Sequence, residues 1–136
     1  MIIRDAVAAD APALIELMAL LGHQLEPATI ARRIALTSLP TLVAAEKERI
    51  VGLCGLAATV HIHREQPVGR ITILVFAEDQ RGRGIGSKLI EEAERRLTAA
   101  GCGIVEVTSN FRFEEGHAFY EARGFTRSSF RFYREL

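Results

Sequence analysis

The amino-acid sequence predicts a single α/β domain over residues 1–136, with a mixed, mostly antiparallel central sheet and helices on both of its faces. Three observations support this fold class. Apolar, β-branched runs separated by polar turns occupy residues 41–77, a helical apolar stripe occupies residues 85–100, and another apolar run follows at 103–108. A chain of 136 residues that is 49% hydrophobic can fill one substantial core.

The N-terminal part predicts one strand and two helices. Ile2 and Ile3 begin a short strand, and Asp10 is placed to cap a following helix that has Pro12 in its first turn. Apolar residues then recur at helical spacing, and Pro27 is placed to open a second, shorter helix. We expect these helices at residues 11–21 and from residue 27 to about residue 38.

The middle of the chain predicts three consecutive strands. Residues 41–45 and 50–63 are separated by a polar turn, and a break that contains Pro67 precedes a third run at residues 70–77. Gly52 and Gly55 inside the second run indicate a bulge or bend. Three strands in succession predict an antiparallel meander.

The last third of the chain predicts a long helix, a strand, a short helix and a closing hairpin. An apolar stripe on the long helix ends at Gly101, and a buried strand is expected at residues 103–108. Gly124 stops a helix expected at residues 114–123, and residues 125–133 are expected to form the hairpin. The stripe consists of Ile85, Leu89, Ala93, Leu97 and Ala100.

Composition excludes several classes of function. Seventeen basic and seventeen acidic residues leave no net charge, so the chain lacks the electrostatic footprint of a nucleic-acid-binding protein. No apolar run approaches the roughly 18 residues that span a bilayer. Cys54 and Cys102 lie in apolar segments without a metal or redox spacing, which favours packing roles in a reducing compartment. We therefore expect a cytoplasmic protein that binds neither nucleic acid nor membrane.

A glycine-rich turn between a strand and a helix carries the strongest functional signal. Gly82, Gly84 and Gly86 fall within five residues, directly before the helical stripe. Glycines let consecutive N–H groups point inward, and a helix N-terminus adds partial positive charge. Arg81 and Arg83 add side chains that suit phosphate oxygens. The segment therefore predicts a pyrophosphate site.

Two common anion-binding motifs do not fit this spacing. A dinucleotide fingerprint requires a third glycine at the position of Ser87. A nucleotide P-loop requires glycine, lysine and then serine or threonine, whereas Lys88 follows Ser87 and precedes Leu89. Another kind of pyrophosphate ligand is therefore expected.

The segment from Arg81 to Gly86 resembles the signature of the GNAT superfamily of acetyl-CoA-dependent N-acetyltransferases, which is Gln or Arg, two residues, Gly, one residue, then Gly or Ala. The stretch from Tyr120 to Phe125 looks like its second hallmark of Tyr, three residues, Gly and Phe. The predicted order of elements is also that of the family. The resemblance implies the GNAT fold and direct transfer of an acetyl group from acetyl-CoA, used as a co-substrate, to a primary amine.

The resemblance implies which residues bind the coenzyme. The family opens its sheet at a bulge, and the pantetheine arm lies against the backbone of the strand that precedes the turn. A backbone N–H there would stabilise the oxyanion of the reacting thioester. The family often has Asn seven residues before the tyrosine, where this chain has Phe113, and Asn110 or Arg112 is the expected substitute. The implied coenzyme-binding residues are Leu74, Val75, Phe76, Arg81, Gly82, Arg83, Gly84, Ile85, Gly86, Ser87 and Asn110.

The resemblance also implies a catalytic role for Tyr120, which would protonate the departing thiolate. A phenol stays protonated near neutral pH and can donate to sulfur. The strand before the turn has no carboxylate where some family members carry a general base, which leaves Glu106, His117 or a chain of water as the base. The same lack supports an alternative, a non-catalytic module that binds or senses acyl-CoA.

Other partners are less specified. His61 and His63 share one side of a strand end without a third ligand, so no metal site is expected. The resemblance implies that the acceptor is an amine on a small molecule or a peptide, and the sequence does not choose among these because acceptor specificity lies in loops. An exposed strand near either terminus leaves a homodimer open.

Overall fold

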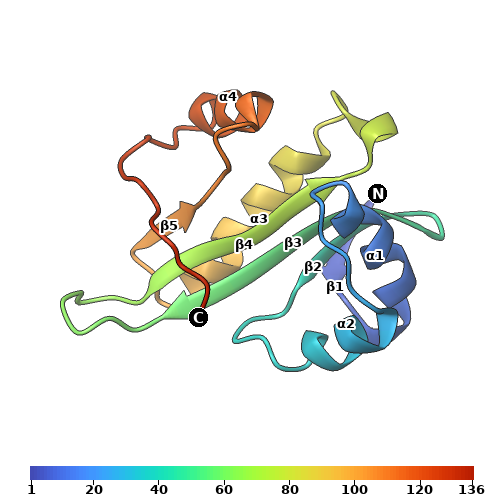
Figure 1. The fold of residues 1–136 in the computed structure, drawn as a ribbon, viewed down its shortest axis with the longest axis horizontal. Helices are drawn as coiled ribbons and strands as arrows, with labels where there is room; N and C mark the ends of the chain where they lie inside the picture. The colour runs from blue at the N-terminus through green and yellow to red at the C-terminus, as the bar shows by residue number, and fades with distance from the viewer. The chain divides into compact units, whose positions relative to one another are not determined.

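The computed structural model describes residues 1–136, which divide into two compact units, Met1–Glu106 and Val107–Leu136. Most of the helices and strands belong to the first unit (Figure 1). The elements are β1 (Ile2–Asp5), η1 (Ala8–Asp10), α1 (Ala11–Ala19), α2 (Pro27–Ile34), β2 (Leu42–Glu46), β3 (Arg49–Thr59), β4 (Val68–Phe76), η2 (Glu78–Gln80), α3 (Ile85–Ala99), β5 (Ile104–Val107) and α4 (Glu114–Ala122).

The strands form one five-stranded sheet in the order β1-β2-β3-β4-β5. The pairs from β1 to β4 are antiparallel, so the predicted meander of β2, β3 and β4 is confirmed. Helix α3 connects β4 to β5, whose arrows point the same way, and the sheet is therefore mixed (Figure 1). The predicted α/β class and the predicted order of elements up to α4 are confirmed.

Helices α1 and α2 cover one face of the sheet. Alternate residues of a strand point to opposite faces, and this face carries Val43, Leu53 and Val75. These side chains are buried in one cluster with Leu14 and Leu17 of α1. Complete burial of such a side chain contributes about 1.5–3 kcal/mol, so this cluster fixes α1 and α2 against the strands.

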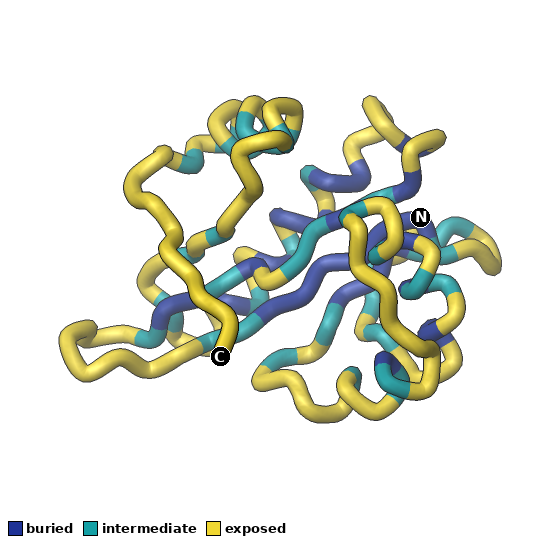
Figure 2. The backbone as a smooth tube through the Cα atoms, viewed as in Figure 1, coloured by how far each residue is buried: buried dark blue, intermediate teal, exposed yellow.

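Helix α3 covers the opposite face. A Cβ atom at Gly52 would lie 2.9 Å from Leu89 Cδ1 and 3.3 Å from Ala44 Cβ, so the absence of a side chain at Gly52 lets α3 approach closely. Because β3 is covered on both faces, every residue from 51 to 56 is buried (Figure 2). The prediction of helices on both faces is confirmed.

The predicted irregularities near Gly52 and Gly55 are also confirmed. The register between β2 and β3 skips Val51, next to Gly52. The register between β3 and β4 skips Thr72, opposite the step from Gly55 to Leu56. Each extra residue increases the local twist of its strand, and the bulge at Thr72 precedes the last residues of β4.

The predicted closing hairpin is wrong. Residues 125–136 contain no helix or strand, and the side chains of Phe130, Phe132 and Tyr133 are exposed. Their spacing suggested strands, but a hairpin on its own is marginally stable and needs an apolar face packed against other elements. Aromatic spacing did not supply that packing surface.

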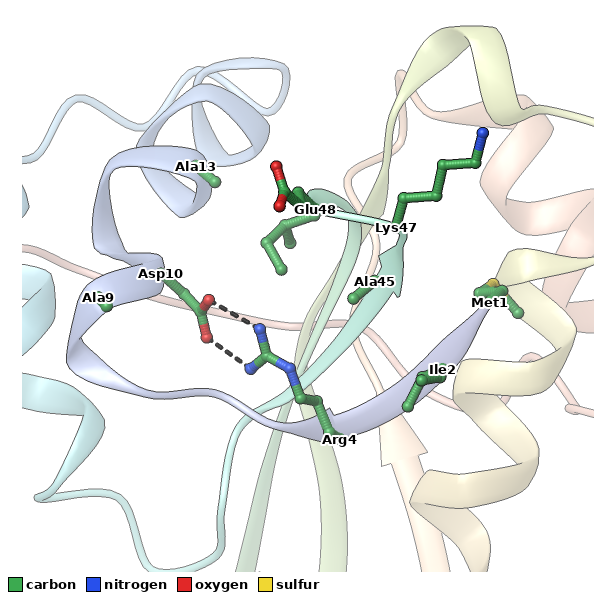
Figure 3. A pocket seen from close by; sticks show the side chains of 10 residues that line it. Met1, Ile2, Arg4, Ala9, Asp10, Ala13, Ala45, Lys47 and Glu48 are labelled. Atoms are coloured by element: carbon green, nitrogen blue, oxygen red, sulfur yellow. Dashed lines mark hydrogen bonds and ion pairs between the residues drawn. The ribbon is translucent and has the colours of Figure 1, made fainter.

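Asp10 does not cap α1 as expected. Its carboxylate makes no hydrogen bond to the first turn of α1. It accepts the Val7 N–H at 2.8 Å and both terminal nitrogens of Arg4 at 2.8 and 3.0 Å (Figure 3). The bond from Arg4 holds the pKa of Asp10 below its usual value. The short helix η1 precedes α1, and Asp10 closes that turn instead.

Two other boundaries differ from expectation. Helix α2 ends at Ile34, and Leu36, which was expected on its apolar side, is 78% exposed. Strand β3 ends at Thr59, so His61 and His63 lie in the following turn segment instead of at a strand end. Their rings make an edge contact with centroids 5.7 Å apart.

Candidate functional site

The glycine-rich turn adopts the backbone that the sequence predicts. It follows β4 and η2, and α3 begins at Ile85. Gly82 and Gly84 have φ angles of 77° and 78°, which L side chains rarely adopt. A Cβ atom at either glycine would meet no atom within 4 Å. The requirement for glycine at these two positions therefore comes from the backbone angle and not from crowding.

The turn presents unpaired backbone donors. No backbone acceptor pairs with the N–H groups of Gly82, Gly84, Ile85, Gly86 or Ser87, and the next N–H, at residue 88, is the first bonded into the helix. Unpaired donors at a helix N-terminus carry partial positive charge and bind phosphate groups. These residues fit the pyrophosphate of a coenzyme.

The hairpin between β2 and β3 supports the turn from outside. Arg49 donates two hydrogen bonds to Asp79, at 2.7 and 3.1 Å, and the Ala77 N–H donates to Val51 O at 2.9 Å. The bond from Arg49 lowers the pKa of Asp79. A residue pair 30 positions apart in sequence thus connects the hairpin to η2, just before the turn.

Arg83 is held by two acceptors on either side of the turn. Its Nη1 donates to Gln80 Oε1 at 2.7 Å, and its Nη2 donates to Glu46 Oε1 at 3.1 Å. Gln80 is buried in η2, whereas Glu46 ends β2. The guanidinium group therefore has a defined position in the structure.

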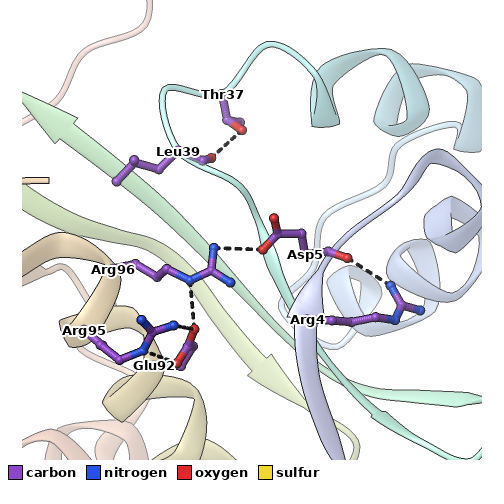
Figure 4. A network of polar contacts seen from close by, with 7 residues as sticks. All are labelled: Arg4, Asp5, Thr37, Leu39, Glu92, Arg95 and Arg96. Carbon is purple, nitrogen blue, oxygen red and sulfur yellow. Dashed lines mark hydrogen bonds and ion pairs between the residues drawn. The ribbon is translucent and has the colours of Figure 1, made fainter. Parts of the chain in front are cut away.

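Polar contacts also fix the far end of α3. Arg96 binds Asp5 of β1 at 2.8 Å, and Glu92 accepts from both Arg95 and Arg96 (Figure 4). The bond from Arg95 comes first among the contacts that lower the pKa of Glu92 to about 2. Helix α3 is thus attached to β1 by charge as well as to the sheet by packing.

Leu74, Val75 and Phe76 form the end of β4. They pair with β3 beyond the bulge at Thr72, and the Val75 side chain is buried in the α1 and α2 cluster. The start of β5 lies beside the start of β4, since the Gly103 N–H donates to the carbonyl of residue 67 at 3.3 Å. The Val75 side chain therefore serves in packing, whereas those of Leu74 and Phe76 are only partly buried.

Tyr120 lies on α4, in the second unit. Its ring makes edge contacts with Phe119 and Phe125, each with centroids 5.5 Å apart. The Phe125 N–H bonds to the Tyr120 carbonyl at 3.1 Å, and Gly124 has a φ of 87°, which ends the helix. The Tyr, Gly and Phe of the second motif thus form one local structure around the helix C-terminus.

Asn110 and His117 interact within the same unit. The His117 Nε2 atom lies 2.8 Å from the Asn110 carbonyl, which can only accept, so Nε2 carries the proton. The Nδ1 atom of neutral His117 is then an acceptor. The Asn110 side-chain oxygen accepts the Arg112 N–H at 3.1 Å, so Asn110 organises its own loop.

Glu106 is engaged differently from His117. Its carboxylate accepts from Arg70 of β4 at 3.1 Å, in an ion pair with both side chains partly exposed. Of the two candidates for the general base, His117 therefore has a basic atom, Nδ1, that is not engaged by a cation, whereas the carboxylate of Glu106 is engaged by Arg70.

Two cavities are lined by residues other than those of the turn. One, of about 380 Å³, lies beside Arg4, Asp10 and Glu48, where the ion pair of Arg4 occupies its polar wall (Figure 3). The other, of about 360 Å³, is lined in part by His117 and Glu121 of α4. No three His, Cys, Asp or Glu side chains gather as metal ligands would. None of the helices has the length and apolarity needed to cross a membrane.

Sequence reasoning missed the side chains that support the turn. Gln80 is one of two buried polar residues, and its place directly before the motif is a usable signal. Glu46, Arg49 and Asp79 have no such signal, because their pairings join segments 30 or 37 positions apart. Only the packing of the β2 and β3 hairpin beside the turn reveals them.

Similarity to known proteins identifies the family. Residues 38–127 match the family model of the acetyltransferase (GNAT) domain. Over 87 residues, 64% of the chain, the sequence is 34% identical to the aminoalkylphosphonate N-acetyltransferase of Salmonella typhimurium, of which it covers 56%. Over 88 residues it is 33% identical to the uncharacterised N-acetyltransferase YhdJ of Bacillus subtilis, of which it covers 61%. The chain thus spans a little over half the length of these curated relatives.

Solved structures agree with this result. The structure of an assigned acetyltransferase from Agrobacterium tumefaciens matches over 100% of both chains, with a TM-score of 0.88 and 28% identity. An acetyltransferase from Trypanosoma brucei matches over 99% of both chains, with a TM-score of 0.84 and 26% identity. The match to the family model covers well over half of the residues, and the fold and both sequence motifs agree with it. The chain therefore belongs to the GNAT superfamily of acetyltransferases.

Proposed function

We propose that this protein is an acetyl-CoA-dependent N-acetyltransferase that transfers an acetyl group directly to a primary amine. The observation that carries the proposal is the turn, where left-handed Gly82 and Gly84 stand in open space beside unpaired N–H groups at the start of α3. Membership of the GNAT family gives acetyl-CoA as the co-substrate that such a turn would bind.

In this proposal the turn binds the pyrophosphate and β4 binds the pantetheine arm. The N–H groups of Gly82, Gly84, Ile85, Gly86 and Ser87 would contact phosphate oxygens, with Arg81 and Arg83 adding charge. The backbone of Leu74, Val75 and Phe76 would pair with the amides of pantetheine. Asn110 is retained as a coenzyme contact, although its side-chain oxygen already accepts from a backbone N–H.

The chemistry needs one proton donor and one proton acceptor. Acetyl-CoA supplies a thioester whose C–S bond breaks as a bond forms between its carbonyl carbon and the amine nitrogen. Tyr120 would donate its phenolic proton to the sulfur. His117 would take the proton that the amine loses, because its Nδ1 has a free lone pair and Nε2 is fixed by Asn110. Glu106 is less suited, since Arg70 already binds its carboxylate.

The acceptor belongs to a broad class. The relative from Salmonella is named for acetylating aminoalkylphosphonates, which are small amines with an anionic group. We propose a small molecule or a peptide with a primary amine as the acceptor, and aminoalkylphosphonates are one class to include among the candidates.

A screen of amines tests this proposal against the alternative of a non-catalytic acyl-CoA-binding module. Purified protein is mixed with acetyl-CoA and a panel of aminoalkylphosphonates, amino sugars, polyamines, amino acids and peptides, and release of the coenzyme thiol is followed. The proposal expects at least one amine to raise thiol release well above hydrolysis, with the acetylated product visible by mass. Binding of acetyl-CoA without turnover on any amine would favour the alternative.

A further inference from the structure

The arginine inside the pyrophosphate turn is already bound by a carboxylate from outside the turn. The two terminal nitrogens of Arg83 face Glu46, at 3.1 Å from Nη2 to Oε1 and 3.3 Å from Nη1 to Oε2. Gln80 takes a further bond from Nη1 at 2.7 Å. This paired arrangement uses the same edge of the guanidinium group that binds two phosphate oxygens.

This contact puts a negative charge beside a site whose backbone favours anions. Glu46 is at the end of β2, and its side chain is 32% exposed, so water partly screens the pair. Exposed ion pairs contribute little to folding stability. An exchange of Glu46 for a phosphate oxygen would therefore cost the protein little.

We propose that Glu46 competes with the pyrophosphate of the coenzyme for Arg83 and thereby lowers the affinity for the acetyl donor. The inference rests on the proposed function, because it assumes that coenzyme A binds at this turn. In the free protein the pair keeps Arg83 in place with its charge neutralised. On binding, the terminal nitrogens of Arg83 turn from Glu46 to the pyrophosphate, and Glu46 passes to solvent.

The neighbouring pair of Arg49 and Asp79 has another role. Arg49 neutralises a carboxylate just before the turn and makes no contact with the donors of residues 82–87. The two ion pairs look alike, but of the two only that of Glu46 involves a side chain of the turn itself. Of the two carboxylates, Glu46 is therefore the competitor.

Calorimetric titration with coenzyme A tests the proposal. Glu46→Gln removes the competing charge and keeps the size of the side chain, and we expect it to tighten binding about 2- to 5-fold. Glu48→Gln on the same hairpin removes an equal charge that makes no contact with Arg83, and it is expected to leave affinity within experimental error. Thermal melting checks that both variants are folded.

A double substitution separates contact from long-range charge. We expect Arg83→Gln to weaken binding of coenzyme A about tenfold. In the Arg83→Gln background, Glu46→Gln should no longer tighten binding, because the guanidinium group for which Glu46 and the pyrophosphate compete is absent. The gain from Glu46→Gln should persist with 3′-dephospho-coenzyme A, since the proposal concerns the pyrophosphate.

Three results would overturn the inference while the proposed function stands. These are normal binding by the wild type with no gain from Glu46→Gln, an equal gain from Glu48→Gln, and a gain that survives Arg83→Gln. Loss of the gain with 3′-dephospho-coenzyme A would contradict the assignment to the pyrophosphate. If wild-type protein bound no coenzyme A at all, the proposed function itself would fail.

Discussion

The turn of residues 82–87 and helix α4 present two different kinds of candidate site. The turn offers backbone N–H groups, and its shape follows from the left-handed backbone of Gly82 and Gly84. Helix α4 offers the side chains of Tyr120 and His117, and none of its residues is buried. The turn follows strands packed on both faces, whereas the contacts of α4 include edge contacts of aromatic rings, a histidine bond and an ion pair between Glu121 and Arg127.

The comparison teaches that a backbone site is encoded locally and a side-chain site is not. Glycine spacing determines the φ angles of the turn, so a few consecutive residues specify it. A catalytic side chain acts only through its neighbours, and these depend on how distant segments pack. Substitutions in the two regions should therefore change different quantities. Those in the turn should change the affinity for acetyl-CoA, and those in α4 should change kcat.

The largest expected effect comes from Tyr120→Phe. If the phenol protonates the leaving thiolate, kcat should fall about 10²- to 10⁴-fold with little change in acetyl-CoA affinity. The wild-type rate should decline at high pH as the phenol ionises. The variant should lack that decline. A variant that keeps more than about half of wild-type kcat, against this range, would make Tyr120 a packing residue.

His117→Gln should have the next largest effect. The amide nitrogen of the introduced glutamine can still donate to Asn110 O, but the amide cannot accept a proton from the amine. We therefore expect kcat to fall about 10²-fold. Glu106→Gln is the matched comparison, since its carboxylate is engaged by Arg70, and it should retain most of the rate. Steady-state kinetics of both variants at several pH values decide between them. A larger loss in Glu106→Gln would reverse the choice of base.

Gly84→Val should change affinity, not rate. Gly84 has a φ of 78° in open space, so valine would strain or shift the turn instead of colliding with a neighbour. Such strain costs about 1–3 kcal/mol, or roughly 5- to 150-fold in affinity for acetyl-CoA if the turn relaxes away from its present shape. Arg95→Ala, on the exposed side of α3, is the control and should bind normally. Normal binding by a folded Gly84→Val protein would place the pyrophosphate elsewhere.

Asp10→Asn should change stability alone, on the order of 1 kcal/mol. Arg4 lowers the pKa of Asp10 in the folded state, so the carboxylate stabilises the fold above its unfolded pKa. That contribution is lost as pH falls through the lowered folded value. Denaturant unfolding should therefore show a difference between variant and wild type at neutral pH that disappears in strong acid. A difference of constant size at every pH would mean that charge is not its source.

Much of the fold was predictable because its signals are local. The spacing of Leu89, Ala93 and Leu97 predicted α3, and glycines predicted the irregularities of β3 and the ends of helices. The predicted hairpin at residues 125–133 failed because aromatic spacing says nothing about a packing partner. The role of Asp10 was missed because Asp10 ends a short helix, η1, and its carboxylate binds Val7 and Arg4 instead of the first turn of α1.

The candidate site was predictable only in part, for the same reason. The motif predicted where α3 begins. The contacts of Arg83 with Glu46 and of Arg49 with Asp79 join segments far apart in sequence, so no local pattern encodes them. The roles of Tyr120 and of the backbone of residues 74–76 remain predictions.

Thermal unfolding with three ligands tests the central claim most directly. If the turn binds the pyrophosphate of acetyl-CoA, that ligand at about 100 times its dissociation constant should stabilise the folded protein by about 2.7 kcal/mol. NAD and ATP also carry linked phosphates, but the spacing of the turn does not match their motifs, so they should shift the melting temperature little at the same concentration. A shift with NAD or ATP equal to or larger than that with acetyl-CoA would contradict the account.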